Sequence, residues 1–277
     1  MGDCTYCGKS AGILNKEHKE CRHTFDAGSQ HMTALVSSTI LQGKPLDTLE
    51  SELEDIARSH FIDASQTRGY LIKGWELAAH LALDDHLLSK EEESRLVALQ
   101  DRYSLSQEEL NKEGAYMQVG KAAVLRDLSE GKMPNRLKVE GNLPFIFHKD
   151  EQLVWLFQRV EYWELKTRRE YVGSSFGVSA RVAKGLYVRS SSFRGHPVET
   201  TGMEPLDTGK LAVTDKSIYF AGSVKDVRIP YNKMVTLEGW TTKGIIICRD
   251  ASTAKPQGFL TGDGWFTANL LSTLARK

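Results

Sequence analysis

In the first half of the chain, hydrophobic residues recur every three or four positions, which is the pattern of amphipathic helices. Several of these segments also begin or end at residues that commonly bound helices, such as Pro45 at a start and Gly43 at an end. In one of them, Leu49, Leu53 and Ile56 fall on a single face. The pattern predicts five helical segments, over residues 32–43, 45–62, 67–87, 88–103 and 105–134.

Two of these helices begin with a serine followed by acidic residues. Ser89 is an expected N-cap, and Ser106 with Glu109 has the spacing of a capping box. The Asp84-Asp85 pair and the run Glu91 to Glu93 could instead bind a divalent cation, but a solvated, N-capped helix start explains them more simply.

The stretches LDDHLLSKEEESRLVAL and YSLSQEEL also resemble the tellurite-resistance-type helical domain of bacteria, in which S-x-E-E phrases open successive helices. The resemblance covers about 50 residues and implies a small helical bundle for spacing or partner contact.

After Pro134 the pattern changes to short runs of β-branched and aromatic residues separated by turn residues, which is typical of antiparallel strands. The final segment again has helical spacing, with Trp265, Phe266, Leu270 and Leu274 on one face. We therefore expect an α+β chain whose C-terminal part is a partly open antiparallel β-barrel capped by a helix. Expected strands lie within residues 151–165, 184–191, 209–222, 226–231, 234–240, 243–250 and 256–262.

The stretch GKLAVTDKSIYFAGSVKDVRIPYNKMVTLEGWTTKGIIICRD resembles the GRAM and bacterial pleckstrin-homology-like (PH-like) family. The resemblance covers about 130 residues, implies the fold more than the function, and places Met234 where the family usually has Ile. The matching residues are Gly209, Leu211, Thr214, Ile218, Phe220, Ile229, Pro230, Tyr231, Lys233, Gly244, Ile245 and Ile247.

Basic residues gather in the segment around TRREYVGSSFGVSARVAKG, where Gly173 and Gly177 suggest a mobile loop and only Glu170 opposes the positive charge. The family resemblance implies that an anionic headgroup would bind in this region, and arginine suits phosphate. Docking on the acidic helices, on a protein partner or on nucleic acid are the alternatives. The candidate anion-binding residues are Lys166, Arg168, Arg169, Arg181, Lys184, Arg189 and Arg194.

The N-terminus carries the pattern C-x2-C-x10-H-x2-C, formed by Cys4, Cys7, His18 and Cys21. Three thiolates and one imidazole complete a tetrahedral structural zinc site, and a metal explains how so short a segment folds. His23 is a less suitable substitute for His18 because it lies only two positions after Cys21. The alternatives are chance clustering, a redox CxxC pair, or an HNH-like nuclease, which CTYCG and KEH resemble although its downstream residues are missing.

Acidic and basic residues are unevenly distributed along the chain, although the formal net charge is zero over 277 residues. Residues 44–133 hold 11 basic and 18 acidic residues, whereas residues 134–277 hold 21 basic and 14 acidic ones. This asymmetry indicates modules with different partners, or modules that face each other. We expect a zinc finger over residues 1–30, an acidic helical bundle over 31–133 and a PH/GRAM-like domain over 143–277.

No catalytic triad, nucleophile elbow or phosphate-binding loop is recognisable. The sequence shows neither a secretory signal nor an apolar stretch long enough to span a bilayer. We therefore expect a cytoplasmic, non-enzymatic adaptor or recruitment protein of bacterial type, acting in solution or at a membrane surface. Its C-terminal module would bind an anionic lipid, a ligand or a protein partner.

Overall fold

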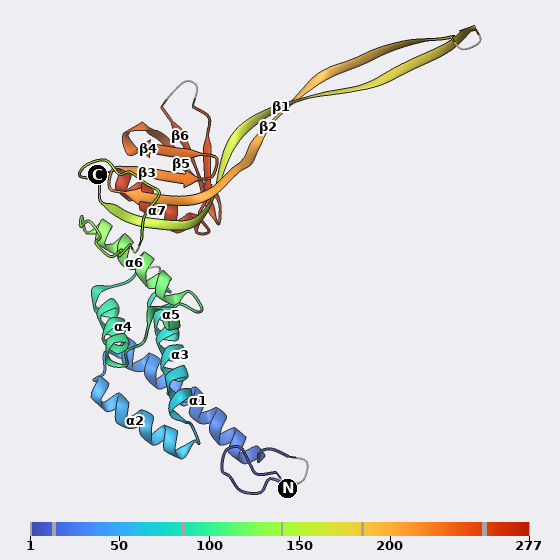
Figure 1. Cartoon of the computed structure of the whole chain (residues 1–277). Helices are drawn as coiled ribbons and strands as arrows, with labels where there is room; N and C mark the ends of the chain where they lie inside the picture. The colour runs from blue at the N-terminus through green and yellow to red at the C-terminus, as the bar shows by residue number, and fades with distance from the viewer. Residues whose placement is uncertain are drawn as a thin grey trace. The chain divides into compact units, whose positions relative to one another are not determined.

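The chain is a mixed protein of helices and strands (Figure 1) that divides into two compact units, residues 1–136 and 137–277. This computed structural model describes all residues except 1, 13–14, 85–86, 140, 184–185, 251–253 and 277, and it describes the backbone alone for residues 169–198. Each unit has its own folded elements, so each is described separately.

The first unit is helical, as the spacing of its hydrophobic residues predicts. Two boundaries differ from the sequence expectation: the first helix begins at Lys19 rather than near residue 32, and the segment 105–134 forms two helices instead of one. Gly114 separates those two, with a positive φ of 82° that glycine adopts easily. The helices are α1 (Lys19–Gln42), α2 (Leu46–Ser59), α3 (Ala64–Ala82), α4 (Lys90–Arg102), α5 (Gln107–Leu110) and α6 (Ala115–Ser129).

The expected helix starts are confirmed by side-chain caps. The side chains of Ser89 and Ser106 each accept a hydrogen bond from the backbone N–H three residues on. In return, the side chains of Glu92 and Glu109 accept from the backbone N–H of these serines, which completes two capping boxes. Asp63 begins α3 in the same way.

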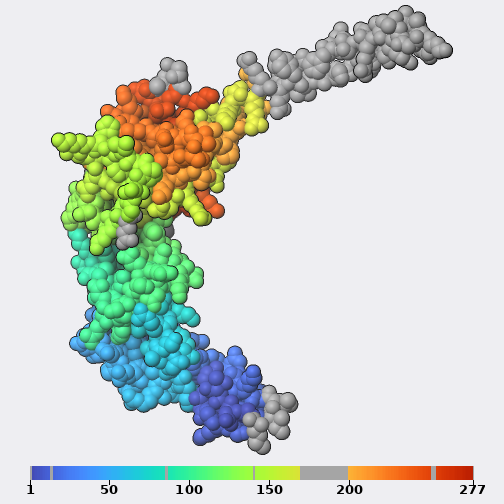
Figure 2. All heavy atoms as spheres, in the orientation of Figure 1, coloured from blue at the N-terminus to red at the C-terminus, as the bar shows by residue number. Residues whose placement is uncertain are grey.

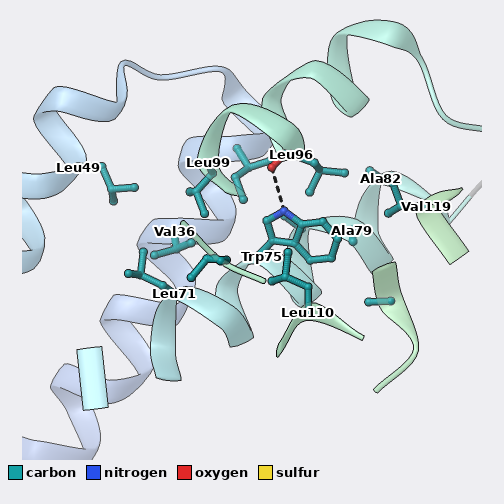
Figure 3. Packing of buried hydrophobic residues seen from close by; sticks show 14 of the residues in the cluster. Val36, Leu49, Leu71, Trp75, Ala79, Ala82, Leu96, Leu99, Leu110 and Val119 are labelled. Atoms are coloured by element: carbon teal, nitrogen blue, oxygen red, sulfur yellow. Dashed lines mark hydrogen bonds between the residues drawn. The ribbon is translucent and has the colours of Figure 1, made fainter. Parts of the chain in front are cut away.

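Trp75 is the centre of the helical core. Its side chain is 1% exposed, and its indole N–H donates to the carbonyl oxygen of Leu96 at 2.9 Å, which joins α3 to α4. Figure 3 shows Leu71, Leu99 and Leu110 among the residues around it, on different helices of the unit. Because the indole has a partner, this large side chain is buried without an unsatisfied polar group.

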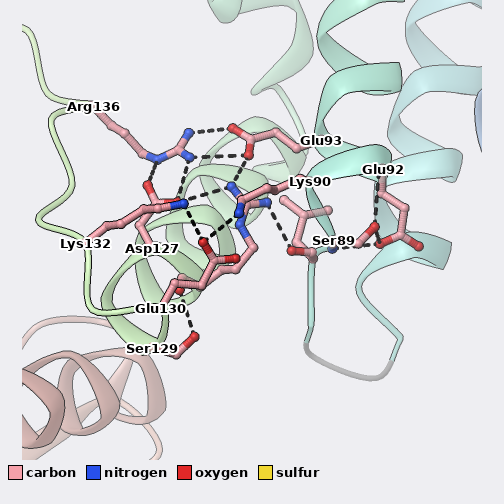
Figure 4. Close-up of polar contacts among 11 residues, drawn as sticks. Ser89, Lys90, Glu92, Glu93, Asp127, Ser129, Glu130, Lys132 and Arg136 are labelled. Carbon is pink, nitrogen blue, oxygen red and sulfur yellow. Dashed lines mark hydrogen bonds and ion pairs between the residues drawn. The ribbon is translucent and has the colours of Figure 1, made fainter.

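An ion-pair cluster joins the start of α4 to the end of α6 (Figure 4). Glu93 and Asp127, whose side chains are 18% and 14% exposed, both pair with Arg126 and Arg136. Glu93 is thus held by arginines and Glu92 by its capping box. These partners account for two of the three glutamates in the divalent-cation alternative, whose Asp85 lies outside the described residues.

The second unit is a curled antiparallel sheet, a half-barrel that is PH-like in shape, followed by a helix. Strand order in the sheet is β4-β3-β2-β1-β7-β6-β5, and the final helix packs on β5 and β6. Its elements are β1 (Leu153–Ala183), β2 (Leu186–Thr214), β3 (Ser217–Gly222), β4 (Asp226–Pro230), η1 (Tyr231–Lys233), β5 (Met234–Thr241), β6 (Gly244–Arg249), β7 (Gln257–Leu260) and α7 (Gly264–Ala275).

Buried aromatic side chains pack together in this unit. Tyr162, Phe220 and Phe259 are fully buried and contact one another through their rings. Phe266, on the predicted inner face of the last helix, packs against Trp155 with ring centroids 4.9 Å apart. Asp263 caps the start of this helix, because its carboxylate accepts a hydrogen bond from the N–H of Phe266 at 3.0 Å.

The expected loop over residues 167–185 was wrong. Most of it belongs to β1, which pairs with β2 from Leu153↔Thr214 to Ala183↔Leu186. Beyond Glu164 no further strand of the described residues joins this pair, because β7 pairs with β1 only over Glu161–Glu164 and β3 pairs with β2 only over Gly209–Val213. We call the two-stranded continuation, from Leu165↔Met203 outward, the ribbon.

Backbone pairing explains why the ribbon is extended although its glycines and serines suggest a loop. Each strand supplies the hydrogen-bond partners of the other, and Val172, Val178, Val188 and Val198 favour extended backbone. At about 3.3 Å per residue, the ribbon is on the order of 60 Å long.

Within the part of the chain that the structure describes, no helix has the length and apolar character needed to span a bilayer.

Candidate metal centre

A short hairpin-like turn positions the first two cysteines. The N–H of Cys4 donates to the carbonyl of Lys9 at 2.7 Å, and the N–H of Gly8 donates back to the carbonyl of Cys4 at 2.9 Å. Gly8 has a φ of 68°, so a residue without Cβ is favoured in this turn. Asp3 and Ser10 form a β-bridge at its open end.

The start of α1 positions the other two candidate ligands. His18 is the N-cap residue of α1, and Cys21 lies three positions on, so both side chains are on the same face of the first turn. The Tyr6 ring packs against the Phe25 ring at a tilt of 34°, with 5.0 Å between the ring centroids, and this contact joins the turn to the helix. Helix α1 begins earlier than the sequence predicted, and its first turn carries two of the four candidate ligands. In the space-filling view of Figure 2, the dark blue atoms of this N-terminal region form one compact body.

The four predicted ligands do come together. One ligand atom from each of Cys4, Cys7, His18 and Cys21 can be chosen so that all lie within 4.8 Å of one another. The His18 Nδ1 is 3.4 Å from the Cys7 sulfur and 3.7 Å from the Cys21 sulfur. Zn–S and Zn–N bonds of about 2.3 and 2.0 Å in a tetrahedron place neighbouring ligand atoms about 3.5–3.8 Å apart, so this set fits a metal ion.

The orientation of the His18 ring suits metal binding through Nδ1. Its Nε2 lies 3.1 Å from the carbonyl oxygen of Ser10, where an Nε2–H group donates. With the proton on Nε2, the lone pair of Nδ1 points to the sulfurs, and such an outer hydrogen bond fixes both tautomer and ring. Ser10 is a functional residue that the sequence does not reveal, because it acts through its backbone.

The thiols differ in how easily they ionise. Burial alone would raise the pKa of Cys4, but hydrogen bonds from nearby backbone N–H groups outweigh it and bring the pKa to about 6. Burial and hydrogen bonds with the other two cysteines raise the pKa of Cys21 to about 11. A bound cation would lower the pKa of Cys21 again, because its positive charge stabilises the thiolate form of the cysteines around it.

The remaining candidates for this site lie elsewhere. All four cysteines are free, so no disulfide competes with the cluster. His23 is not part of the group of four. Cys248 lies on β6 and is half-buried, rather than fully buried as the run IIIC suggests.

The candidate anion-binding residues are spread along the ribbon instead of converging in a loop. Arg168 forms a two-pronged ion pair with Glu204, at 2.5 and 2.8 Å, from the neighbouring strand. Glu204 was missed in the sequence because it is 36 positions away. Lys166 faces Gly202 in the register.

For the other candidates the structure gives backbone placement only, and Lys184 lies outside the described residues. Arg181 pairs with Tyr187 and Ser179 pairs with Arg189, so Arg181 and Arg189 occupy diagonal positions near the end of the ribbon. Closer to the sheet, Arg169 pairs with Glu199 and Ser174 pairs with Arg194. The side chains of Arg169, Arg181, Arg189 and Arg194 are outside the described part.

Comparisons with known proteins add no family assignment: no protein-family model matches the chain, and no curated protein is significantly similar to it.

Proposed function

We propose that Cys4, Cys7, His18 and Cys21 hold a zinc ion whose role is structural. Three sulfur donors and one imidazole nitrogen are a common donor set of structural zinc. All four positions of a tetrahedral ion would be filled by the protein, whereas catalytic zinc keeps one for water or substrate. His18 would serve as a ligand through Nδ1, which argues against the general-base role that an HNH-like nuclease would give it.

We further propose that the chain is a non-enzymatic recruitment protein whose PH-like unit contacts an anionic partner through the ribbon. The observation that carries this proposal is the ribbon itself, because six of the seven candidate basic residues lie on its two strands. A two-stranded ribbon without a third strand is marginally stable alone in water, so binding to a surface would stabilise it. Clustered arginine and lysine attract anionic membranes by about 1 kcal/mol per residue near the surface.

The test is co-sedimentation of the full chain with liposomes of phosphatidylcholine alone or with phosphatidylserine. The informative variant is Arg181→Glu/Arg189→Glu, because Arg168 is already engaged by Glu204. The matched control is Lys233→Glu/Lys243→Glu, which makes the same charge change at exposed positions away from the ribbon. We expect pelleting with anionic liposomes that the ribbon variant loses and the control keeps. No pelleting at low salt would refute the membrane partner.

Nucleic acid is a second candidate, because a two-stranded β-ribbon fits the major groove of DNA. The same variants in fluorescence anisotropy with a 20-base-pair duplex distinguish the two. Binding whose logarithmic affinity falls linearly with the logarithm of the salt concentration would support the nucleic-acid function. Absence of binding in 50 mM salt would exclude it.

A further inference from the structure

A pocket of about 490 Å³ lies between α2 and α3 of the helical unit, away from both sites discussed above. Ligand pockets for small molecules span about 300–1,000 Å³, so the volume suits a small organic molecule. The residues that matter for its chemistry are Glu50, Leu53, Glu54, Ala57, Ala64 and Tyr103.

The interior of the pocket is mostly apolar. Leu53 and Leu71 contribute buried side chains, and the small side chains of Ala57 and Ala64 leave the space open. One polar atom lies behind this surface: the Tyr103 hydroxyl is shielded from solvent and has no hydrogen-bond partner in the described part of the chain. The side chain of Tyr103 therefore adds mainly its ring to the pocket lining.

Charges at the mouth of the pocket leave an excess of carboxylate. Arg68 is fully engaged, because it makes two hydrogen bonds to Glu109 at 2.7 and 2.8 Å and donates to the carbonyl of Tyr103. Arg58 pairs with Asp55 at 3.5 Å.

The other carboxylates at the mouth are not balanced in this way. Glu50 shares the single cation Arg102 with Asp47, at 2.7 and 3.1 Å. Glu54 has no basic partner among the described residues. Of the two carboxylates that line the pocket, Glu50 thus shares its basic partner and Glu54 has none in the described part of the chain.

We propose that this pocket binds a small organic cation with an apolar body. The apolar part would fill the space beside Ala57 and Ala64, and its cationic group would face Glu54. Each part of the ligand is thus matched by a group in the pocket, and the proposal is independent of the zinc ion and of the ribbon.

The test compares three probes that differ only in their head group: 4-phenylbutylamine, 4-phenylbutan-1-ol and 4-phenylbutyrate. Titration of the full chain labelled with ¹³C at alanine methyl groups gives affinities, and shifts of Ala57 and Ala64 show where each probe binds. A ligand of this size is expected to have a dissociation constant on the order of millimolar. We expect the amine to bind at least about fivefold more tightly than the alcohol, and the acid to bind most weakly, since about 1 kcal/mol of charge attraction corresponds to such a factor.

Two matched variants keep the proposal falsifiable. Glu54→Gln should reduce the preference for amine over alcohol to less than about twofold, whereas Glu52→Gln, on the same helix but outside the pocket lining, should leave it unchanged. Ala57→Leu should weaken all three probes while the spectrum of the rest of the protein remains that of a folded chain. Equal affinity for the three probes, shifts confined to other alanines, or an unchanged preference in Glu54→Gln would each overturn the proposal.

Discussion

The N-terminal segment around the cysteines and the ribbon both lack a hydrophobic core of their own, yet they are ordered in opposite ways. In the N-terminal segment, side chains from positions 4 to 21 converge on one point. In the ribbon, the backbones of two strands pair from Leu165↔Met203 to Ala183↔Leu186. A segment organised by convergence is expected to collapse when one ligand is lost, whereas a ribbon can be shortened pair by pair without effect on the sheet that carries it.

The largest effect is expected from Cys7→Ser. Structural zinc contributes about 10–16 kcal/mol in finger peptides at neutral pH, so loss of one ligand should leave the segment unfolded. We expect about one zinc ion per chain in the parent protein and much less in the variant, measured by plasma emission spectroscopy. NMR signals of residues 2–18 should move to unfolded positions.

The control for this variant is Cys248→Ser, which removes a thiol outside the cluster and should keep both zinc and fold. Retention of one zinc ion in Cys7→Ser would contradict the proposed ligand set. Zinc affinity should also fall with decreasing pH, because the raised pKa of Cys21, about 11 without metal, means that its proton must leave when zinc binds.

Trp75→Ala is expected to have the next largest effect, and it acts on a region organised by a core. Removing a buried tryptophan typically costs about 3–5 kcal/mol. Urea unfolding followed by far-ultraviolet circular dichroism should show this loss for the helical unit. Zinc content should not change under native conditions, and a variant that lost its zinc while still folded would mean that the two regions are coupled.

A smaller, pH-dependent effect is expected at the Arg68–Glu109 pair. Hydrogen bonds from Arg68, and then from Ser106, lower the pKa of Glu109 from 4.5 to about 2. Because the folded-state pKa lies below the unfolded one, the stabilisation is complete above about pH 4.5 and is lost as the pH falls toward 2.

In Arg68→Met, unfolding midpoints measured between pH 7 and pH 2.5 should therefore show less acid sensitivity than those of the parent. Arg58→Met removes an exposed arginine with a weaker pair and should retain the parent profile. Identical profiles for parent and Arg68→Met would show that the pair contributes nothing to acid sensitivity.

The smallest effect on stability is expected from removal of the ribbon. Residues 167–201 can be replaced by Asn-Gly, since Lys166 and Gly202 are register partners and Asn-Gly favours a tight hairpin turn. Because no other strand pairs with the removed residues, the melting temperature of the sheet should change by no more than about 5 °C. Failure of this variant to fold would show that the ribbon is part of the core, whereas a folded variant that no longer binds anionic liposomes would support recruitment.

The sequence revealed the candidate metal site almost completely, because spacing alone fixes which side chains can reach one ion. It did not reveal the carbonyl of Ser10, since backbone groups have no sequence signature. It also placed the start of α1 too late, because Lys19 to His31 is mostly polar and only the position of Cys21 one turn after His18 requires a helix there.

The β-rich unit was predicted less completely than the metal site. Hydrophobic runs and turn residues correctly predicted strands within residues 209–222 and 226–231, and helical spacing correctly predicted the last helix. The ribbon was missed because its extended backbone is fixed by pairing with residues far along the chain, such as Lys166 with Gly202, which is 36 positions away. Local composition, rich in glycine and serine, is similar for a loop and for an uncovered strand pair.

The ribbon also determines what a single cut in the backbone would do. The chain leaves the sheet along β1 and returns along its immediate neighbour β2, so a protease acting between these strands would not separate the pieces. The half-barrel would continue to hold both fragments, because β1 of the first fragment remains paired with β2 and β7 of the second. A nicked protein would thus migrate as two bands in denaturing gels and as one species in size-exclusion chromatography.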